Sequence, residues 1–211
     1  MEQSVISMKK HAVKKVIALA SAGAVLLLAG CSSPTAAFSV GKKSTSVNEV
    51  QTSVNNIMDA RKKVDTTGMN LQTGSALVEG QVQFLLISQL LADTAKSVGI
   101  TVVPAEVASE KAAAIKQVGG ETALPKALVG AGIDPTKVDQ YFTSVIYSQK
   151  LSAYVQKAGV DKTKVGAALT EMVATIATKE GVTVNPRYGT WDPKSATLVP
   201  ADASSGAVKT K

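Results

Sequence analysis

The stretch SALVEGQVQFLLISQLLADTAKSV, residues 75–98, is the most apolar helical candidate in the body of this chain and decides the fold. Its apolar residues fall on more than one helical face, so a helix here is buried on several sides. A strand over residues 82–91 is the weaker interpretation, because glutamine, serine and alanine interrupt the alternation that a half-buried strand requires. The stretch therefore predicts a central helix on which the other elements pack.

Further helices are predicted on both sides of this stretch from apolar spacing and capping residues. Ser46 and Glu49 have the spacing of a capping box, in which the serine accepts from the amide three residues on and the glutamate reaches back. Asp134 followed by Pro135 marks the start of a long helix, and Thr163 is a candidate cap for the last one. The segments predicted as helices are 47–63, 75–98, 105–118, 121–129, 135–158 and 164–179.

Short strand-like segments stand near the two ends of the body. Residues 36–40 predict a strand closed by a turn at residues 41–43. Residues 181–192 have turn and strand chemistry, and residues 197–200 are a candidate return strand. Residues 201–211 lack apolar weight, which predicts a disordered tail. A mainly helical body flanked by short β segments is therefore expected.

The start of the chain has the order of a secretory signal. Four lysines precede an apolar run over residues 16–28, and small residues lead to Cys31, the single cysteine of the chain. The sequence Leu28-Ala29-Gly30-Cys31 resembles the bacterial lipobox, in which the cysteine thiol is acylated and the chain is cut before it. We predict a signal peptide over residues 1–30 and a lipidated tether over residues 31–35, which holds the protein on the extracytoplasmic face of a cell membrane.

Two other interpretations of this leader are open. A spanning anchor needs roughly 20 apolar residues, which is more than the run provides. An ordinary cleaved signal would leave an unpaired thiol in an oxidising compartment. Acylation removes that thiol, and each buried methylene adds about 0.8 kcal/mol of membrane affinity. The leader is compatible with a start at Met1 or at Met8, and with an inner or an outer membrane.

Composition narrows the chemistry of the body. The leader holds four lysines and one glutamate, a net +3 of the chain's formal +7, and no basic run is interleaved with aromatic residues, so a nucleic-acid partner is not expected. The single histidine, His11, also lies in the leader. Without histidine or a free thiol, the processed chain has no Ser-His-Asp or Cys-His nucleophile and no His/Cys metal site. We therefore expect no enzyme, no cofactor and no metal.

Three segments carry a resemblance to a known family: the strand, turn and helix start over residues 36–50, the long helix that starts at Asp134, and the stretch VNPRYGTWD, residues 184–192. In this order they resemble the N-terminal chaperone domain of the SurA/PrsA extracytoplasmic folding factors. The resemblance covers about residues 36–200. It implies a SurA N-terminal-like fold that is mainly α, with a small β element joining the N- and C-terminal segments.

The chain departs from that family at one point. Full-length members carry a parvulin-type prolyl isomerase domain between the long helix and the returning C-terminal helix. Here only residues 159–162 separate the two predicted helices, and the body has none of the histidines that a parvulin site resembles. The resemblance therefore implies a chaperone-like domain without isomerase activity, which binds unfolded or nascent secreted proteins. A lipid-anchored prolyl isomerase or hydrolase is the enzyme alternative.

A chaperone of this kind needs adaptable apolar and aromatic side chains on an accessible surface. The candidate client-binding residues are Phe84, Tyr141, Tyr147, Tyr154 and Met172. The alternative for each is a plain packing role in the core. Tyr188 and Trp191 are expected to seat the C-terminal hairpin on the helices, with Arg187 between them pairing with a carboxylate. The alternative function is a structural or scaffold lipoprotein that binds one folded envelope partner through a defined apolar patch.

Overall fold

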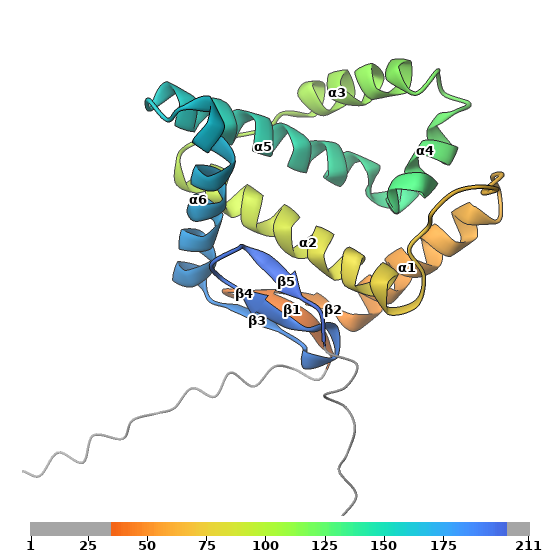
Figure 1. Ribbon diagram of the computed structural model, residues 1–211, viewed down its shortest axis with the longest axis horizontal. Helices are drawn as coiled ribbons and strands as arrows, with labels where there is room; N and C mark the ends of the chain where they lie inside the picture. The colour runs from red at the N-terminus through yellow and green to blue at the C-terminus, as the bar shows by residue number, and fades with distance from the viewer. Residues whose placement is uncertain (1–34, 202–211) are drawn as a thin grey trace, which may run out of the picture. The chain divides into compact units, whose positions relative to one another are not determined.

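Helix α2 (Gly74–Ser97) runs through the centre of the protein, as its apolar sequence predicts (Figure 1). The computed structural model describes residues 35–201. The predicted signal peptide, Cys31 and most of the tether and of the tail lie outside the described residues. All the helices and strands given below lie within residues 35–201, so a chain that begins at Ser32 retains every described contact.

The described part is mainly helical, with six α-helices and short 3₁₀ turns. Around α2 the helices are α1 (Val47–Arg61), α3 (Pro104–Gln117), α4 (Leu124–Ala131), α5 (Val138–Lys157) and α6 (Val165–Glu180). The 3₁₀ turns are η1 (Pro135–Lys137), η2 (Lys162–Lys164) and η3 (Pro186–Tyr188). The strands are β1 (Ala36–Val40), β2 (Lys43–Ser46), β3 (Val182–Val184), β4 (Thr190–Asp192) and β5 (Thr197–Val199).

A small antiparallel sheet joins the two ends of the described chain, which confirms the predicted β element. Its strand order is β2-β1-β3, so the N-terminal hairpin receives a strand from the C-terminal segment. Strand β2 was not predicted, because residues 43–46 have little apolar character of their own. Gly41 turns the β1–β2 hairpin at a positive φ of 57°, a conformation that glycine adopts without steric cost.

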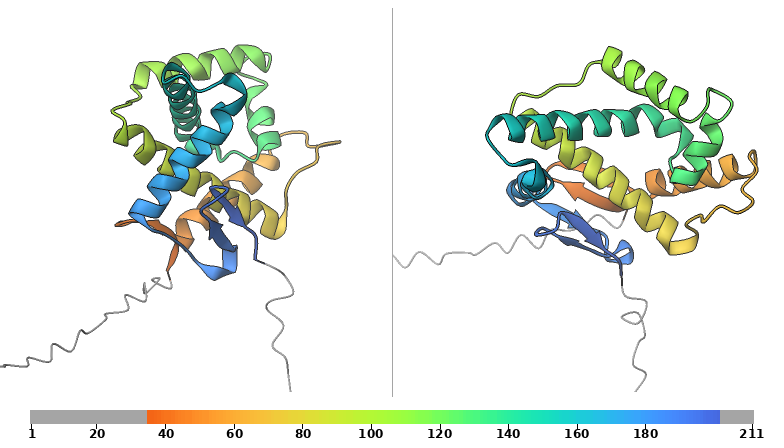
Figure 2. Two further views of the ribbon diagram at one scale, coloured as in Figure 1. Left: turned by 60° about the vertical axis from the view of Figure 1, so that its left-hand side comes forward. Right: turned by 45° about the horizontal axis from the view of Figure 1, so that its top comes forward.

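Strands β4 and β5 form a second, two-stranded antiparallel sheet, the return strand expected from the sequence. This hairpin lies beside β3 and against α2 (Figure 2). The backbone N–H of Leu198 in β5 donates to Oε1 of Gln83 on α2 at 2.6 Å. Tyr188 and Trp191 pack on the main core, which confirms that they seat the hairpin. Within residues 35–201 no ion pair of Arg187 with a carboxylate is found.

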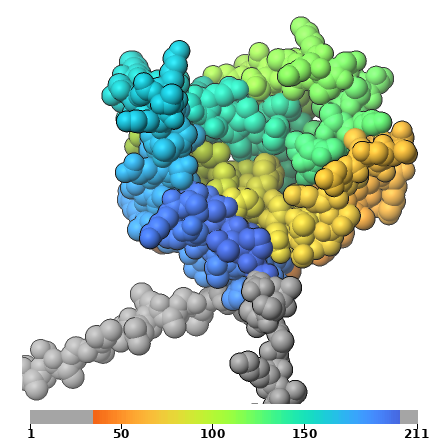
Figure 3. Space-filling view, viewed as in Figure 1, coloured from red at the N-terminus to blue at the C-terminus, as the bar shows by residue number. Residues whose placement is uncertain are grey.

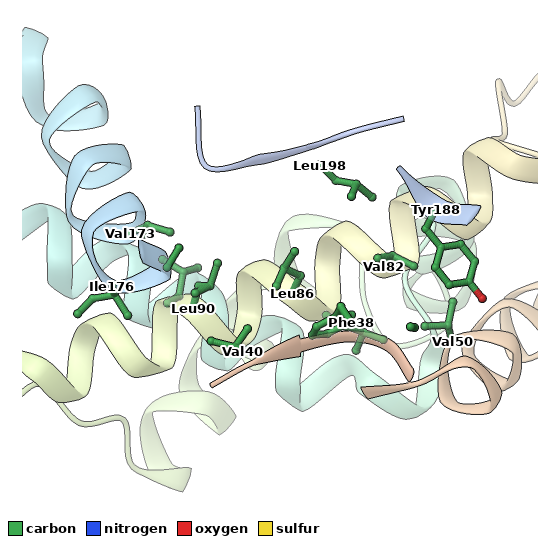
Figure 4. Close-up of a cluster of buried hydrophobic side chains, with 14 of the residues drawn as sticks. Phe38, Val40, Val50, Val82, Leu86, Leu90, Val173, Ile176, Tyr188 and Leu198 are labelled. Carbon is green, nitrogen blue, oxygen red and sulfur yellow. The ribbon is translucent and has the colours of Figure 1, made fainter. Parts of the chain in front are cut away.

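The main core lies between α2, α6 and the sheets (Figure 4). Leu86 and Leu90 of α2 are fully buried there, and burying a side chain of this size contributes about 1.5–3 kcal/mol. A second cluster, formed by Leu128, Val138 and Phe142, holds α3 and α4 onto the first turns of α5. The long helix α5 therefore connects two cores. The other buried members of the main core are Ala37, Phe38, Val40, Val50, Val82, Leu85, Leu91, Ala95, Leu151, Val173, Ile176, Ala177, Tyr188 and Leu198.

The predicted capping box at α1 is half correct. The Ser46 hydroxyl accepts from the Glu49 N–H at 3.0 Å, as expected for an N-cap. The Glu49 carboxylate does not close the box, because it accepts instead from Nζ of Lys137 at 2.9 Å. The carboxylate makes a stronger hydrogen bond with the charged ammonium of Lys137 than it would with the neutral N–H of Ser46. Tertiary packing brings Lys137 of η1 close enough for this bond.

The starts of α5 and α6 are built in the same way. The Asp134 carboxylate accepts from the N–H of Thr136 at 2.9 Å, which confirms the predicted cap, but the first turn after it is 3₁₀. At α6 the cap is Asp161, which accepts from the N–H of Thr163 at 2.8 Å. Thr163 was the wrong choice, because its backbone N–H is the donor that the cap satisfies.

Helix α4 begins and ends later than predicted. It runs over Leu124–Ala131 and so passes through Gly130, the residue directly after the predicted range. The helix ends at Gly132, whose left-handed conformation lets the N–H of Ile133 donate to the carbonyl of Leu128 at 2.9 Å. This bond satisfies one of the free carbonyls at the helix end.

Candidate functional site

The contact between α2 and α5 holds most of the residues with a candidate function. The hydroxyls of Ser88 on α2 and Ser144 on α5 are hydrogen-bonded across this contact at 2.9 Å. Ser144 also lies 3.0 Å from the carbonyl oxygen of Gln140 one turn earlier. One side of this line of contact between the helices faces the β1–β2 hairpin, and the other side faces away from it.

The hairpin side of this contact is hollowed into a pocket of about 430 Å³, called here the α2–α5 pocket. Most of the residues that line it have hydroxyl, amide or charged side chains, although more of the wall area is apolar than polar. The lining residues are Lys43, Thr45, Glu49, Leu85, Ser88, Gln89, Ala92, Gln140, Thr143, Ser144 and Tyr147. A concavity between the long helix and the helix that carries Phe84 therefore exists, but most of its hydrogen-bonding capacity comes from side chains that the sequence did not single out.

One lining residue has an unmet hydrogen bond. Nε2 of Gln89 is buried and has no partner among the described residues. Three residues in that part of the chain carry such nitrogens, namely Arg61, Gln89 and Trp191. A buried donor without an acceptor costs about 1–3 kcal/mol. Gln89 also lines the pocket, so a turn of its side chain would bring the unpaired amide to a carbonyl placed there.

The other side of the α2–α5 contact is aromatic. The rings of Phe84 and Tyr141 lie 6.4 Å apart between centroids, and Tyr141 meets Phe142 edge to face at 5.3 Å. At 3.6 residues per turn, Phe84 lies roughly a quarter turn around α2 from the residues that line the pocket. Phe84 and Tyr141 are both half-buried. The space-filling view shows the surface hollowed between α2 and the corner of α4 and α5 (Figure 3).

The remaining candidates lie apart from this pair. Tyr147 packs on the main core and lines the α2–α5 pocket. Met172 of α6 packs partly buried against the main core. Tyr154, near the end of α5, is 44% exposed. The structure thus brings Phe84 and Tyr141 together and leaves the other three at separate positions. Their client-binding role stays a prediction.

The acidic groups with shifted pKa values are structural. Glu106 has a lowered pKa because it accepts a hydrogen bond from Lys150 and another from the N–H of Val103. The pKa of Asp161 is lowered by its hydrogen bonds from Thr163. Asp192 is similar, with Ser195 as the main cause of its lowered pKa. Each of these carboxylates caps or closes a turn. Within residues 35–201 no group of three or more metal-ligating side chains gathers.

One helix of the described part, α2, is long and apolar enough to cross a membrane. Its position in the main core accounts for that apolar character, since Val82, Leu86 and Leu90 are all buried there. Buried core helices of globular domains can have the same length and apolar composition. Helix α2 therefore does not indicate a membrane span.

Comparison of the chain with protein-family profiles, with curated proteins and with solved structures finds no match. The class that the structure defines is a mainly helical domain with a small antiparallel sheet that unites its N- and C-terminal segments.

Proposed function

We propose that this protein is a lipid-anchored, extracytoplasmic lipoprotein that holds unfolded exported polypeptides through the α2–α5 pocket. The observation that supports it best is the unpartnered amide nitrogen of Gln89, a residue that lines a pocket together with hydroxyl and amide side chains. Every polypeptide offers backbone carbonyls, so a donor of this kind binds chains of many sequences. The aromatic pair on the other side of the contact adds sequence-tolerant apolar area.

The finer fold belongs to the same proposal. The order of β1, turn, capped α1 and returning C-terminal strand is the order on which the resemblance to the SurA/PrsA N-terminal domain rests. Only the 3₁₀ turn η2 and a few loop residues lie between α5 and α6, which leaves no room for an isomerase domain there. We propose a holdase without isomerase activity, which releases its client by equilibrium because its contacts are individually weak.

A scaffold that binds one folded partner is the second candidate, and the structure favours it less. Such a partner needs a contiguous apolar patch. Among residues 35–201, the large apolar residues that are most exposed are spread over different elements instead. They are Met58 on α1, Val103 before α3, Val118 after α3, Tyr154 on α5 and Val199 on β5.

Aggregation of an unfolded client tests the holdase proposal. The chain from Ser32 onward, at micromolar concentration, should suppress the light scattering that aggregating clients of varied hydrophobicity produce. Gln89→Leu should weaken that suppression. Met58→Ala removes an exposed apolar side chain on α1, outside the candidate residues, and should leave the suppression unchanged. No suppression by the unaltered chain with any client would overturn the proposal.

The anchor is tested separately. Mass spectrometry of the protein from the membrane fraction should find an acylated Cys31 as the first residue, and Cys31→Ala should release the protein from that fraction. An unmodified thiol on protein recovered from the cytosol would remove the extracytoplasmic part of the proposal.

A further inference from the structure

Strand β3 is an edge strand whose outward hydrogen-bonding groups can be identified from its register. Its residues pair with β1 as Phe38↔Val184, Ser39↔Thr183 and Val40↔Val182. The ladder continues on both sides, with Gly41 N–H donating to the Gly181 carbonyl at 3.0 Å and Asn185 N–H donating to the Ala37 carbonyl at 2.8 Å.

In an antiparallel ladder, hydrogen-bonded and non-hydrogen-bonded pairs alternate. Residues 181, 183 and 185 therefore direct their main-chain groups toward β1. The N–H and C=O groups of Val182 and Val184 point the opposite way, out of the sheet edge. Within residues 35–201 these outward groups make no hydrogen bond to other backbone groups.

A groove of about 500 Å³ lies along this edge, between β3 and β4, and is called here the β3–β4 groove. Its wall is apolar where the two strands and α6 meet. The lining includes Ala177, Val182, Val184, Pro186, Trp191 and Pro193. The indole Nε1 of Trp191 is buried without a partner among the described residues. The groove thus combines an unpaired strand edge with an apolar wall.

We propose that the β3–β4 groove binds an extended polypeptide segment as an added strand on β3. Unpaired edge groups are a template for another strand, and strand addition uses main-chain bonds for affinity and alternate side-chain pockets for specificity. The groups of Val182 and Val184 recur every second residue, which is the spacing at which an added strand presents its own N–H and C=O groups. The apolar wall takes the alternate side chains.

This inference rests on the proposed function, because it names the client chemistry: an unfolded segment with alternating apolar and polar residues. It also adds a second binding place, at the end of the molecule where the N- and C-terminal strands meet. The α2–α5 pocket satisfies single carbonyls, whereas the β3 edge requires an extended backbone.

The test uses Trp191, the single tryptophan of the chain, as a fluorescent reporter in the groove wall. A short peptide with alternating apolar and polar residues is titrated into the chain from Ser32 onward. Two further peptides carry N-methyl groups on alternate residues, in opposite phases. We expect one phase to lose at least tenfold in affinity and the other to bind as the unmodified peptide does, because only one set of amides faces β3.

If both N-methylated peptides bind as tightly as the unmodified one, or if both lose affinity equally, strand addition would be overturned. Peptide binding that appears only in a chain ending at Ala201 would assign the edge to the protein's own tail and would also overturn the proposal. The outcome is separable from that of the holdase test. Aggregation can be suppressed while the phases bind equally, which removes this inference alone, and phase-dependent binding without suppression removes the holdase function alone.

Discussion

Two glutamines on α2, Gln81 and Gln89, should respond to the same substitution in opposite directions. Gln81 is 4% exposed and both of its polar atoms are paired, since its Oε1 accepts from the Ser53 hydroxyl at 3.0 Å and its Nε2 donates to the Gly132 carbonyl at 2.9 Å. Nε2 of Gln89 is buried with no partner among the described residues. Replacement by leucine removes satisfied hydrogen bonds in one case and an unsatisfied donor in the other.

The magnitudes follow from the cost of an unpaired buried group, about 1–3 kcal/mol. Gln81→Leu leaves the Ser53 hydroxyl and the Gly132 carbonyl unpaired, so we expect the free energy of unfolding to fall by about 2–4 kcal/mol. Gln89→Leu removes a penalty and adds apolar area, so we expect a gain of about 1 kcal/mol. For a domain of this size, that gain raises the melting temperature by about 2–4 °C.

Urea denaturation of the chain from Ser32 onward, followed by the fluorescence of Trp191, measures both changes. The pairing with function makes the test sharper, because Gln89→Leu should gain stability while it loses client protection. A loss of stability in Gln89→Leu equal to that in Gln81→Leu would refute the reasoning, since it would show that the Gln89 amide is satisfied in the folded protein.

Three further changes test the fold. Asp134→Ala should lower the free energy of unfolding by about 1–2 kcal/mol through loss of the α5 cap, measured by urea denaturation, with Asp134→Asn less damaging because it keeps an acceptor. The pKa of Glu106 is lowered, first by its hydrogen bond from Lys150, so the ionised carboxylate stabilises the folded state. This stabilisation is present above the ordinary pKa of 4.5 and is lost as the pH falls below it. In Glu106→Gln, the melting temperature should therefore fall less steeply as the solution is acidified. Gly189→Ala should prevent the β4–β5 hairpin from closing, because a Cβ there would meet a β5 carbonyl oxygen. The control, Gly159→Ala, has a positive φ of 92° but open space around it, and should lower the free energy of unfolding by only about 1–2 kcal/mol. Equal losses of stability in thermal melts followed by circular dichroism would contradict this prediction.

Local signals were enough for most of the helical framework. The central helix, the Ser46 and Asp134 caps and strand β1 were all predicted from residues close together in the chain, because helix periodicity and capping involve neighbours within about four positions. The small sheet that joins the chain ends was expected only through the family resemblance. Strand β2 was missed because its residues become a strand by pairing with β1.

The candidate site depended on contacts between distant residues. The sequence by itself determined that the body lacks histidine and a free thiol, and that α2 carries Phe84 on an apolar helix. Tertiary structure alone decided that Phe84 meets Tyr141, and that hydroxyl and amide side chains line the pocket on the other side of the α2–α5 contact. Gln81 and Gln89 of α2 show the physical reason. They are eight residues apart, which places them about 80° apart around the helix after two full turns. The elements packed against each face of α2 therefore decide that the Gln81 amide is hydrogen-bonded and that Nε2 of Gln89 has no partner among the described residues.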